Sequence, residues 1–287
     1  MNPGPADYEG ELSSRKRELN VFWSQYKQQF KEWLSLKEIG DRTKKDYLKA
    51  LDRIFKEHRV ELERKSLEAT IKAYNRSQAY VFGLRHFLTF LGEEGIIRED
   101  LADYLKSKLH RRRSGIRQIF ISDEELREAY KHIQEKGEPY LTIFLFMVYS
   151  GMRLSQTVRI LNSWNWWKAV VVNEKVVRYP AEETTRRKKR AFWAYLPRDF
   201  AELLEPTSIK YNTAQDTKYG KVSPNTIRKW HYTFLVRQGV PADIADFIQG
   251  RASQRVGATH YLNKTLLADE WYSAVVDDLK KVLEGSE

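Results

Sequence analysis

The spacing of apolar residues is the sequence feature that most constrains the fold of this 287-residue chain. Along most of its length they recur every three or four positions, which is the period of an α-helix that buries one face. We therefore predict helices near residues 19–40, 41–57, 64–74, 77–92 and 99–109, with Asp41 as the N-cap of the second. Residues 167–197 instead alternate β-branched and aromatic side chains around a basic turn, which predicts a strand near 169–172 and a hairpin near 185–189.

A single interruption of the helical pattern divides the chain into two predicted domains. Residues 110–118 read HRRRSGIRQ, with no apolar period and four arginines around a Ser-Gly pair, and we interpret them as a basic linker. This linker separates a helical domain, residues 15–109, from a second domain, residues 119–287, and residues 1–14 are predicted to be a flexible terminus. The expected fold class is mainly α with a small antiparallel β-sheet, and the sheet belongs to an α+β C-terminal domain.

In the second domain, predicted helices flank the hairpin on both sides. Ser122, with Glu125 three positions later, has the pattern of a capping box that opens a helix. Residues 140–149 are almost entirely apolar and predict a buried helix, and helical spacing resumes at 158–161. After Pro224 the pattern is helical again, and residues 266–283 predict an amphipathic C-terminal helix.

Composition narrows the classes of partner. The chain has no cysteine, which excludes disulfides and thiol nucleophiles, and its six histidines do not lie at metal-site spacing, so we expect no metal. Lys and Arg number 50 against 39 Asp and Glu, and the formal net charge of +11 favours a polyanionic partner, with nucleic acid as the first candidate. No apolar run is long enough to span a bilayer and the N-terminus lacks the order of a signal peptide, so we expect no membrane association and a cytoplasmic location.

Residues 223–261 place several cations near a tyrosine. Arg228 lies one helical turn after Asn225, and Arg251 follows a second apolar-periodic segment ahead of Tyr261. A phenol is a poor nucleophile toward a phosphodiester anion unless fixed cations neutralise that anion as the transition state forms. This segment therefore indicates phosphate chemistry at the tyrosine.

Together with an upstream arginine and a hairpin lysine, this segment resembles the tyrosine recombinase (integrase) family, and the resemblance covers the whole chain. Residues 150–155, SGMRLS, match the first arginine box of the family, and residues 225–228, NTIR, match the second, which usually reads His-x-x-Arg. Gly250-Arg251 matches a Gly-His or Gly-Trp pair and lies ten residues before the tyrosine (261 − 251 = 10). The match is strongest to the fusellovirus-type integrases of archaea, in which arginine takes that last position and a non-histidine residue begins the second box.

The resemblance implies an enzyme that cleaves and rejoins DNA strands. Tyr261 would attack a DNA phosphate and form a 3′-phosphotyrosyl link, which conserves bond energy, so that no cofactor is required. Arg153 and Arg228 are suited to clamp the non-bridging phosphate oxygens, because guanidinium geometry matches phosphate, and Arg251 would add a third donor.

Two parts of the implied site leave alternatives open. The general acid for the leaving 5′-oxygen would be a hairpin lysine, with Lys189 favoured by its distance from the next strand and Lys188 or Arg186 as the other candidates. Asn225 cannot act as an acid or base near neutral pH, so we expect it to position the phosphate. Gln156 stands where many relatives carry an acidic residue. These departures favour one alternative function, a catalytically impaired DNA-binding protein; a second is a type IB topoisomerase-like enzyme that only relaxes supercoils.

The resemblance also implies partners. The helical domain and the linker would hold double-stranded DNA against the catalytic domain, and a homo-tetramer would form on DNA, from a monomer or weak dimer in its absence. The C-terminal helix would either dock on a neighbouring protomer or pack on its own domain. The cations expected to contact DNA are Lys44, Lys45, Arg85, Arg111, Arg112, Arg113 and Arg117.

Overall fold

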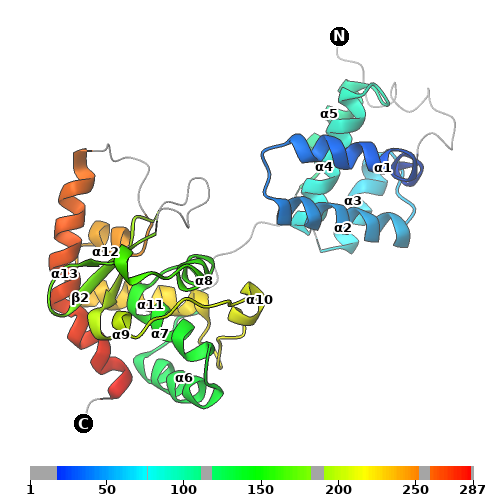
Figure 1. Cartoon of the computed structure of the whole chain (residues 1–287). Coiled ribbons are helices and arrows are strands. Elements are labelled where there is room, and N and C mark those ends of the chain that lie inside the picture. Colours follow the sequence, from blue (N-terminus) through cyan, green and yellow to red (C-terminus); the bar gives the residue numbers. More distant parts are fainter. Residues whose placement is uncertain (1–17, 76, 111–117, 182–190, 252–258, 286–287) are drawn as a thin grey trace. The chain divides into compact units, whose positions relative to one another are not determined.

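Figure 1 shows the computed structural model of the chain, which divides into two compact units, Met1–Ile116 and Arg117–Glu287. The structure describes residues 18–75, 77–110, 118–181, 191–251 and 259–285, without the side chains of residues 259–263. Each unit has its own apolar core and is described by itself.

The N-terminal unit is mainly helical in its described part, with one isolated antiparallel bridge between Glu18 and Glu61. Its core contains Trp23, Phe30 and Phe87, whose rings meet edge to face with centroids 5.1 to 5.8 Å apart, an arrangement that aromatic quadrupoles favour. The helices are α1 (Leu19–Leu36), α2 (Asp41–Glu57), α3 (Arg64–Ala73), α4 (Gln78–Glu93) and α5 (Glu99–Lys108).

Two predicted details of this unit are wrong. Helix α1 ends at Leu36 rather than Gly40, because its buried stripe ends at Leu34 and Leu36 already faces solvent. Asp41 is the first residue of α2 and not its N-cap, which is Gly40. A carboxylate in the first turn still complements the positive end of the helix dipole.

In the C-terminal unit, helices pack around a small sheet. The predicted capping box opens α6: the Ser122 hydroxyl accepts from the Glu125 N–H, and the Glu125 carboxylate accepts from the Ser122 N–H. The apolar segment predicted to be buried forms α7. Helical structure resumes at Leu154, four residues earlier than predicted. The helices are α6 (Asp123–Lys136), α7 (Tyr140–Ser150), α8 (Leu154–Asn162), α9 (Arg198–Glu202), α10 (Tyr211–Ala214), α11 (Pro224–Arg237), α12 (Ala242–Ile248) and α13 (Thr259–Glu284), with a 3₁₀ turn at Trp166–Lys168.

The predicted small antiparallel sheet is confirmed, and with it the mainly helical fold class. Its strands are β1 (Val170–Val171), β2 (Val176–Pro180) and β3 (Trp193–Pro197), in the order β1-β2-β3. Arg178 is paired with Val170 on one side and with Tyr195 on the other. Helices α7 and α12 pack against β3, and α13 packs against β2. The hairpin turn predicted near 185–189 lies outside the described residues.

Helix α13 begins at Thr259, seven residues before the predicted start, and therefore includes Tyr261 in its backbone. Its apolar face is covered by its own unit, where Ala268, Tyr272 and Leu279 are completely buried. The alternative that this helix packs on its own domain is thus the one adopted in the single chain.

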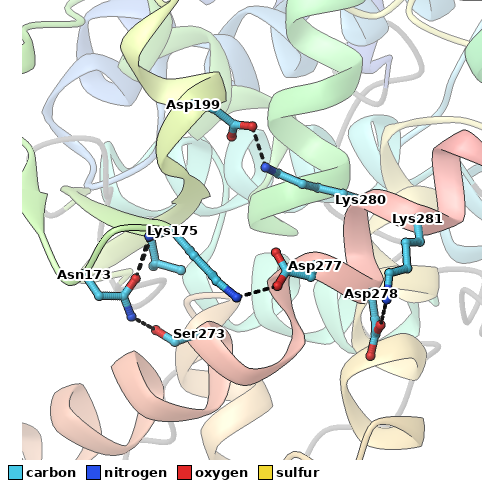
Figure 2. Close-up of polar contacts among 9 residues, drawn as sticks. Asn173, Lys175, Asp199, Ser273, Asp277, Asp278, Lys280 and Lys281 are labelled. Carbon is cyan, nitrogen blue, oxygen red and sulfur yellow. Dashed lines mark hydrogen bonds and ion pairs between the residues drawn. The ribbon is translucent and has the colours of Figure 1, made fainter.

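A row of polar contacts follows the exposed edge of α13 in Figure 2. The Asn173 amide donates to the Ser273 hydroxyl at 2.7 Å, and Lys175 pairs with Asp277 at 2.7 Å. Farther along, Lys280 pairs with the carboxylate of Asp199 in α9. Exposed pairs of this kind each stabilise a fold by only about 0.2 to 1 kcal/mol, so the apolar face dominates the docking of the helix.

None of the helices that the structure describes is both long enough and apolar enough to cross a membrane.

Candidate active site

The first arginine box lies at the junction of α7 and α8. Helix α7 ends at Gly151, whose φ of +59° is the left-handed conformation that stops a helix with least strain in glycine. The chain then turns so that Arg153 caps α8, and its backbone N–H faces the Gln156 side-chain oxygen at 3.4 Å. The Arg153 guanidinium, half-buried, donates from Nη1 to the carbonyl of Gly250 at 3.0 Å.

Arg228 projects from α11 into the interior of the unit. Its Nη1 donates to the carbonyl of Gly151 at 2.6 Å, and only 8% of the residue is exposed. Its Nη2 is buried and has no hydrogen-bond partner among the described residues. Burial and, after it, the charges of Arg153 and Arg251 lower the pKa of Arg228 to about 9. This arginine is therefore held where an anion would relieve both its desolvation and its missing hydrogen bond.

Arg251 is placed by the way α12 ends. Gly250 has a φ of +63°, its N–H donates to the Phe247 carbonyl at 2.9 Å, and the Arg251 N–H donates to the Asp246 carbonyl at 2.7 Å. These two bonds form a Schellman motif, for which a glycine is favoured at the left-handed position. The Arg251 guanidinium lies 4.9 Å from the centroid of the Tyr232 ring, in cation–π geometry. The Gly-Arg pair is thus a helix terminus that turns a cation toward the other two arginines.

The electrostatic balance of these side chains is strongly positive. Arg153, Arg228 and Arg251 are accompanied by the carboxylate of Asp246, whose Oδ1 is 3.9 Å from the Arg251 Nη1. Burial raises the pKa of Asp246, against the opposing effect of the Arg251 charge. Burial, and then the Arg251 charge, lower the pKa of Arg153. A site with this excess of guanidinium groups is suited to bind a phosphate.

A buried polar network formed by His231 and Gln249, which the sequence analysis did not predict, contacts the backbone of Arg228. His231, one turn after Arg228 on α11, is completely buried and its Nε2 lies 2.9 Å from the carbonyl of Tyr149. The Gln249 amide nitrogen lies 2.9 Å from His231 Nδ1 and 2.8 Å from the Arg228 carbonyl. With these partners, Nε2 carries the proton and Nδ1 accepts from the amide. Burial lowers the pKa of His231 to about 3, so the ring stays neutral.

The remaining predicted catalytic residues are only partly described. Asn225 is exposed in the first turn of α11, one turn before Arg228. Tyr261 belongs to the first turn of α13, while its side chain lies outside the described part. Lys188 and Lys189, together with Arg186, also lie outside it.

The cations predicted to contact DNA belong mainly to the N-terminal unit. Lys45 of α2 and Arg85 of α4 are exposed. The Lys44 ammonium donates to the Ser35 carbonyl at 2.6 Å. The linker residues Arg111, Arg112, Arg113 and Arg117 lie outside the described residues. In the described ranges, no three histidine or carboxylate side chains gather as a metal site would require.

Comparison with known proteins places the chain in one family. The chain is similar to the crystal structure of XerA recombinase, with 12% sequence identity over 92% of this chain and all of that one, but the TM-score of 0.35 is too low to carry an argument. The comparison with curated protein sequences found no match. The family model described as archaeal phage integrase matches residues 118–278, which is more than half of the chain. The chain therefore belongs to the archaeal phage integrase family of tyrosine recombinases.

Proposed function

We propose that this chain is a site-specific DNA recombinase that cleaves and rejoins strands through a 3′-phosphotyrosyl intermediate on Tyr261. Family membership supports the integrase function in general. The observation that carries the detailed mechanism is the buried Arg228, whose Nη2 has no partner in the described part of the chain although Arg153 and Arg251 lie nearby.

The energetic argument starts from the unsatisfied guanidinium. Burying a charged donor without a partner costs several kcal/mol, and the low pKa of Arg228 reflects that cost. Such a group persists when the binding of an anion compensates for it. A phosphate that gains negative charge in the transition state would be held more tightly than the ground state, and that difference accelerates the reaction.

In the proposed cleavage step, the Tyr261 oxygen forms a bond to phosphorus while the bond from phosphorus to the 5′-oxygen breaks. The phenol proton passes to water, and the leaving 5′-oxygen takes a proton from Lys189 or Lys188. Asn225 donates a hydrogen bond to the phosphate. Religation is the reverse, with a 5′-hydroxyl as the attacking group, so the number of phosphodiester bonds is unchanged.

The proposal extends to assembly. Double-stranded DNA lies along the basic residues of the N-terminal domain and the linker, and their lysines and arginines displace counterions, which makes binding weaker as the salt concentration rises. Two duplexes are joined in a homo-tetramer, while the free protein is a monomer or weak dimer.

The experiment is a covalent trap. The full chain is incubated with a pool of nicked duplexes of randomised sequence, in which cleavage releases a short fragment and cannot be reversed. Adducts that survive detergent are isolated and their DNA is sequenced, which defines a substrate for the variants. Tyr261→Phe is expected to form no adduct, whereas Tyr219→Phe, which changes an exposed tyrosine of the same unit, is expected to retain it.

Arg228 provides the second arm of the same experiment. Arg228→Lys keeps the positive charge but cannot present the planar pair of donors, so we expect cleavage to fall by about a hundredfold. Arg237→Lys, an exposed change on the same helix, is the matched control.

The outcomes separate the candidate functions. An adduct that forms equally well with Tyr261→Phe refutes the mechanism. A wild-type chain that binds DNA but forms no adduct would be a catalytically impaired DNA-binding protein. With the substrate in hand, two-site plasmids that give no recombinants while one-site plasmids are relaxed would identify a topoisomerase.

A further inference from the structure

Away from the arginines, a compact polar cluster connects α13 to the sheet. Asp269 of α13 forms an ion pair with Arg178 of β2, and these side chains are only 14% and 19% exposed. Its second carboxylate oxygen, Oδ1, accepts from the hydroxyl of Tyr195 in β3 at 3.0 Å. The two strand residues are direct partners in the β2–β3 register, so one carboxylate bridges both strands.

The cluster is more buried than the polar contacts on the exposed edge of α13. Tyr195 is completely buried, and its hydroxyl also lies 3.4 Å from the carbonyl of Thr265. Burial, and then the Asp269 charge, raise the pKa of Tyr195, so its hydroxyl stays protonated and can donate. Arg178 is held from the side by the Trp193 ring, whose centroid is 4.7 Å from the guanidinium carbon. By contrast, the Lys175–Asp277 pair has side chains 49% and 50% exposed.

The cluster lies close to the start of α13 and hence to the proposed nucleophile. Thr265 follows Tyr261 by four residues, about one helical turn or 6 Å, and Asp269 follows it by eight residues, about 12 Å. The strands that hold Asp269 are β2 and β3, which flank in sequence the segment that contains Lys188 and Lys189.

Apolar packing alone would not set the register of this helix. The buried residues of its apolar face recur at intervals of three or four, and apolar attraction has no direction, so a shift along or about the axis costs little if the face stays covered. A partly buried carboxylate that must meet a guanidinium on one oxygen and a phenol on the other tolerates no such shift. The buried face consists of Ala268, Tyr272, Val275, Val276, Leu279 and Leu283. The Tyr272 hydroxyl donates to the Tyr149 carbonyl at 2.9 Å. This bond restrains the helix at a point three residues farther from Tyr261 than Asp269.

We propose that Asp269, Arg178 and Tyr195 are positioning residues of this recombinase: they fix the register of α13 on the sheet and so place Tyr261 for attack. None of the three touches the DNA phosphate. They act through the part of α13 between Tyr261 and Asp269, about two turns, and they link that helix to β2 and β3. This inference rests on the proposed function, because it takes Tyr261 as the nucleophile.

The test separates positioning from stability and from DNA binding. Asp269→Asn removes the charge with almost no change of shape, and Tyr195→Phe removes one hydroxyl. The rate of adduct formation is measured in a single turnover at saturating concentrations of the nicked substrate defined above. The dissociation constant for the uncleaved duplex and the thermal midpoint are measured on the same samples, and rates are taken well below each midpoint.

We expect Asp269→Asn to slow cleavage by about ten- to a hundredfold, since small misplacements of reacting groups have effects of this size. Tyr195→Phe is expected to slow it by about two- to tenfold, in line with the loss of one hydrogen bond. The dissociation constant should change by less than about twofold in both. The matched controls are Asp277→Asn, on the exposed edge of the same helix, and Tyr179→Phe, whose buried hydroxyl donates to the Ser163 carbonyl instead of to α13.

Each result decides between the two claims. Cleavage by Asp269→Asn and Tyr195→Phe at the rate of their controls would refute the positioning role while leaving Tyr261 as nucleophile. A parallel loss of DNA binding and cleavage would also refute it, because a structural defect has that signature. A wild-type chain that forms no adduct would refute the proposed function, and the inference with it.

Discussion

Replacing Gly151 with alanine adds only a methyl group, but we expect it to destabilise the C-terminal unit strongly because the methyl group would collide with buried side chains. A Cβ atom at this position would lie 2.4 Å from His231 Nδ1 and 2.7 Å from the Gln249 amide nitrogen. Both side chains are completely buried and hydrogen-bonded, so neither can withdraw without breaking the network that supports Arg228. The carbonyl of Gly151 itself accepts from Arg228, so a shift of the backbone would disturb the same arginine.

The size of the effect follows from two separate costs. Alanine in the left-handed conformation costs about 1 to 2 kcal/mol wherever it occurs. Displacing His231 or Gln249 leaves buried polar atoms unpaired, at about 1 to 3 kcal/mol each. With two such atoms unpaired, we expect Gly151→Ala to lower the free energy of unfolding of the C-terminal unit by about 3 to 8 kcal/mol in total.

Gly220 provides the matched control, because it has nearly the same backbone angle, a φ of +52° against +59°, but no atom within 4 Å of the place where a Cβ would lie. Gly220→Ala should therefore show the conformational cost alone, about 1 to 2 kcal/mol. Unfolding in urea is followed by hydrogen exchange and mass spectrometry of peptides from residues 117–287, so that the two units are read separately. If the two variants differ by less than about 1 kcal/mol, the reasoning that neither His231 nor Gln249 can yield is wrong.

Two further predictions concern titration and the leaving group. The pKa of His231 is about 3 in the folded chain against about 6.5 when unfolded. Below pH 6.5 the unfolded state therefore takes up a proton that the folded state does not, and the free energy of unfolding falls by about 1.4 kcal/mol per pH unit. His231→Gln should remove this pH dependence, and urea titrations between pH 6.5 and 4.5 that show the same dependence in the variant and the wild type would contradict the prediction. The second prediction identifies the general acid. Whichever of Lys189→Ala and Lys188→Ala stops cleavage should cleave again when sulfur replaces the 5′-bridging oxygen of the DNA, because a thiol, with a pKa of about 8.5, leaves without a proton. If a variant cleaves both substrates equally slowly, the lysine that it lacks is not the general acid.

The sequence motifs located the arginines because their positions are fixed by local structure. Glycine stops α7 two residues before Arg153 and stops α12 one residue before Arg251, and both stops are visible in the sequence as a glycine after an apolar helix. Arg228 lies five residues into α11, a helix whose start is signalled by Ser223 and Pro224. Local rules of helix capping thus predict much of the framework of the site.

The buried support of the site was not predictable in the same way. His231 and Gln249 meet beneath Gly151 across separations of 18 and more residues, and no local pattern distinguishes a core histidine from a solvated one. The bond from Asp269 to Tyr195 joins residues 74 apart. The early start of α13 was missed because residues 259–265 contain few apolar positions, so helical periodicity has no signal there.

The side chains that contact the backbone of Arg228 and lie beneath it in the core, Gln249 and His231, are electrically neutral. Arg228 is held through its main-chain carbonyl by Gln249 and contacts the Gly151 carbonyl, while His231 remains uncharged. A carboxylate in place of the Gln249 amide could not donate to the Arg228 carbonyl, and its charge would cancel part of the field that a phosphate would experience. Gln156 is likewise neutral, since it accepts from the Arg153 backbone N–H without adding negative charge. Neutral support therefore holds Arg228 in place and leaves its positive charge available to the phosphate of the proposed reaction.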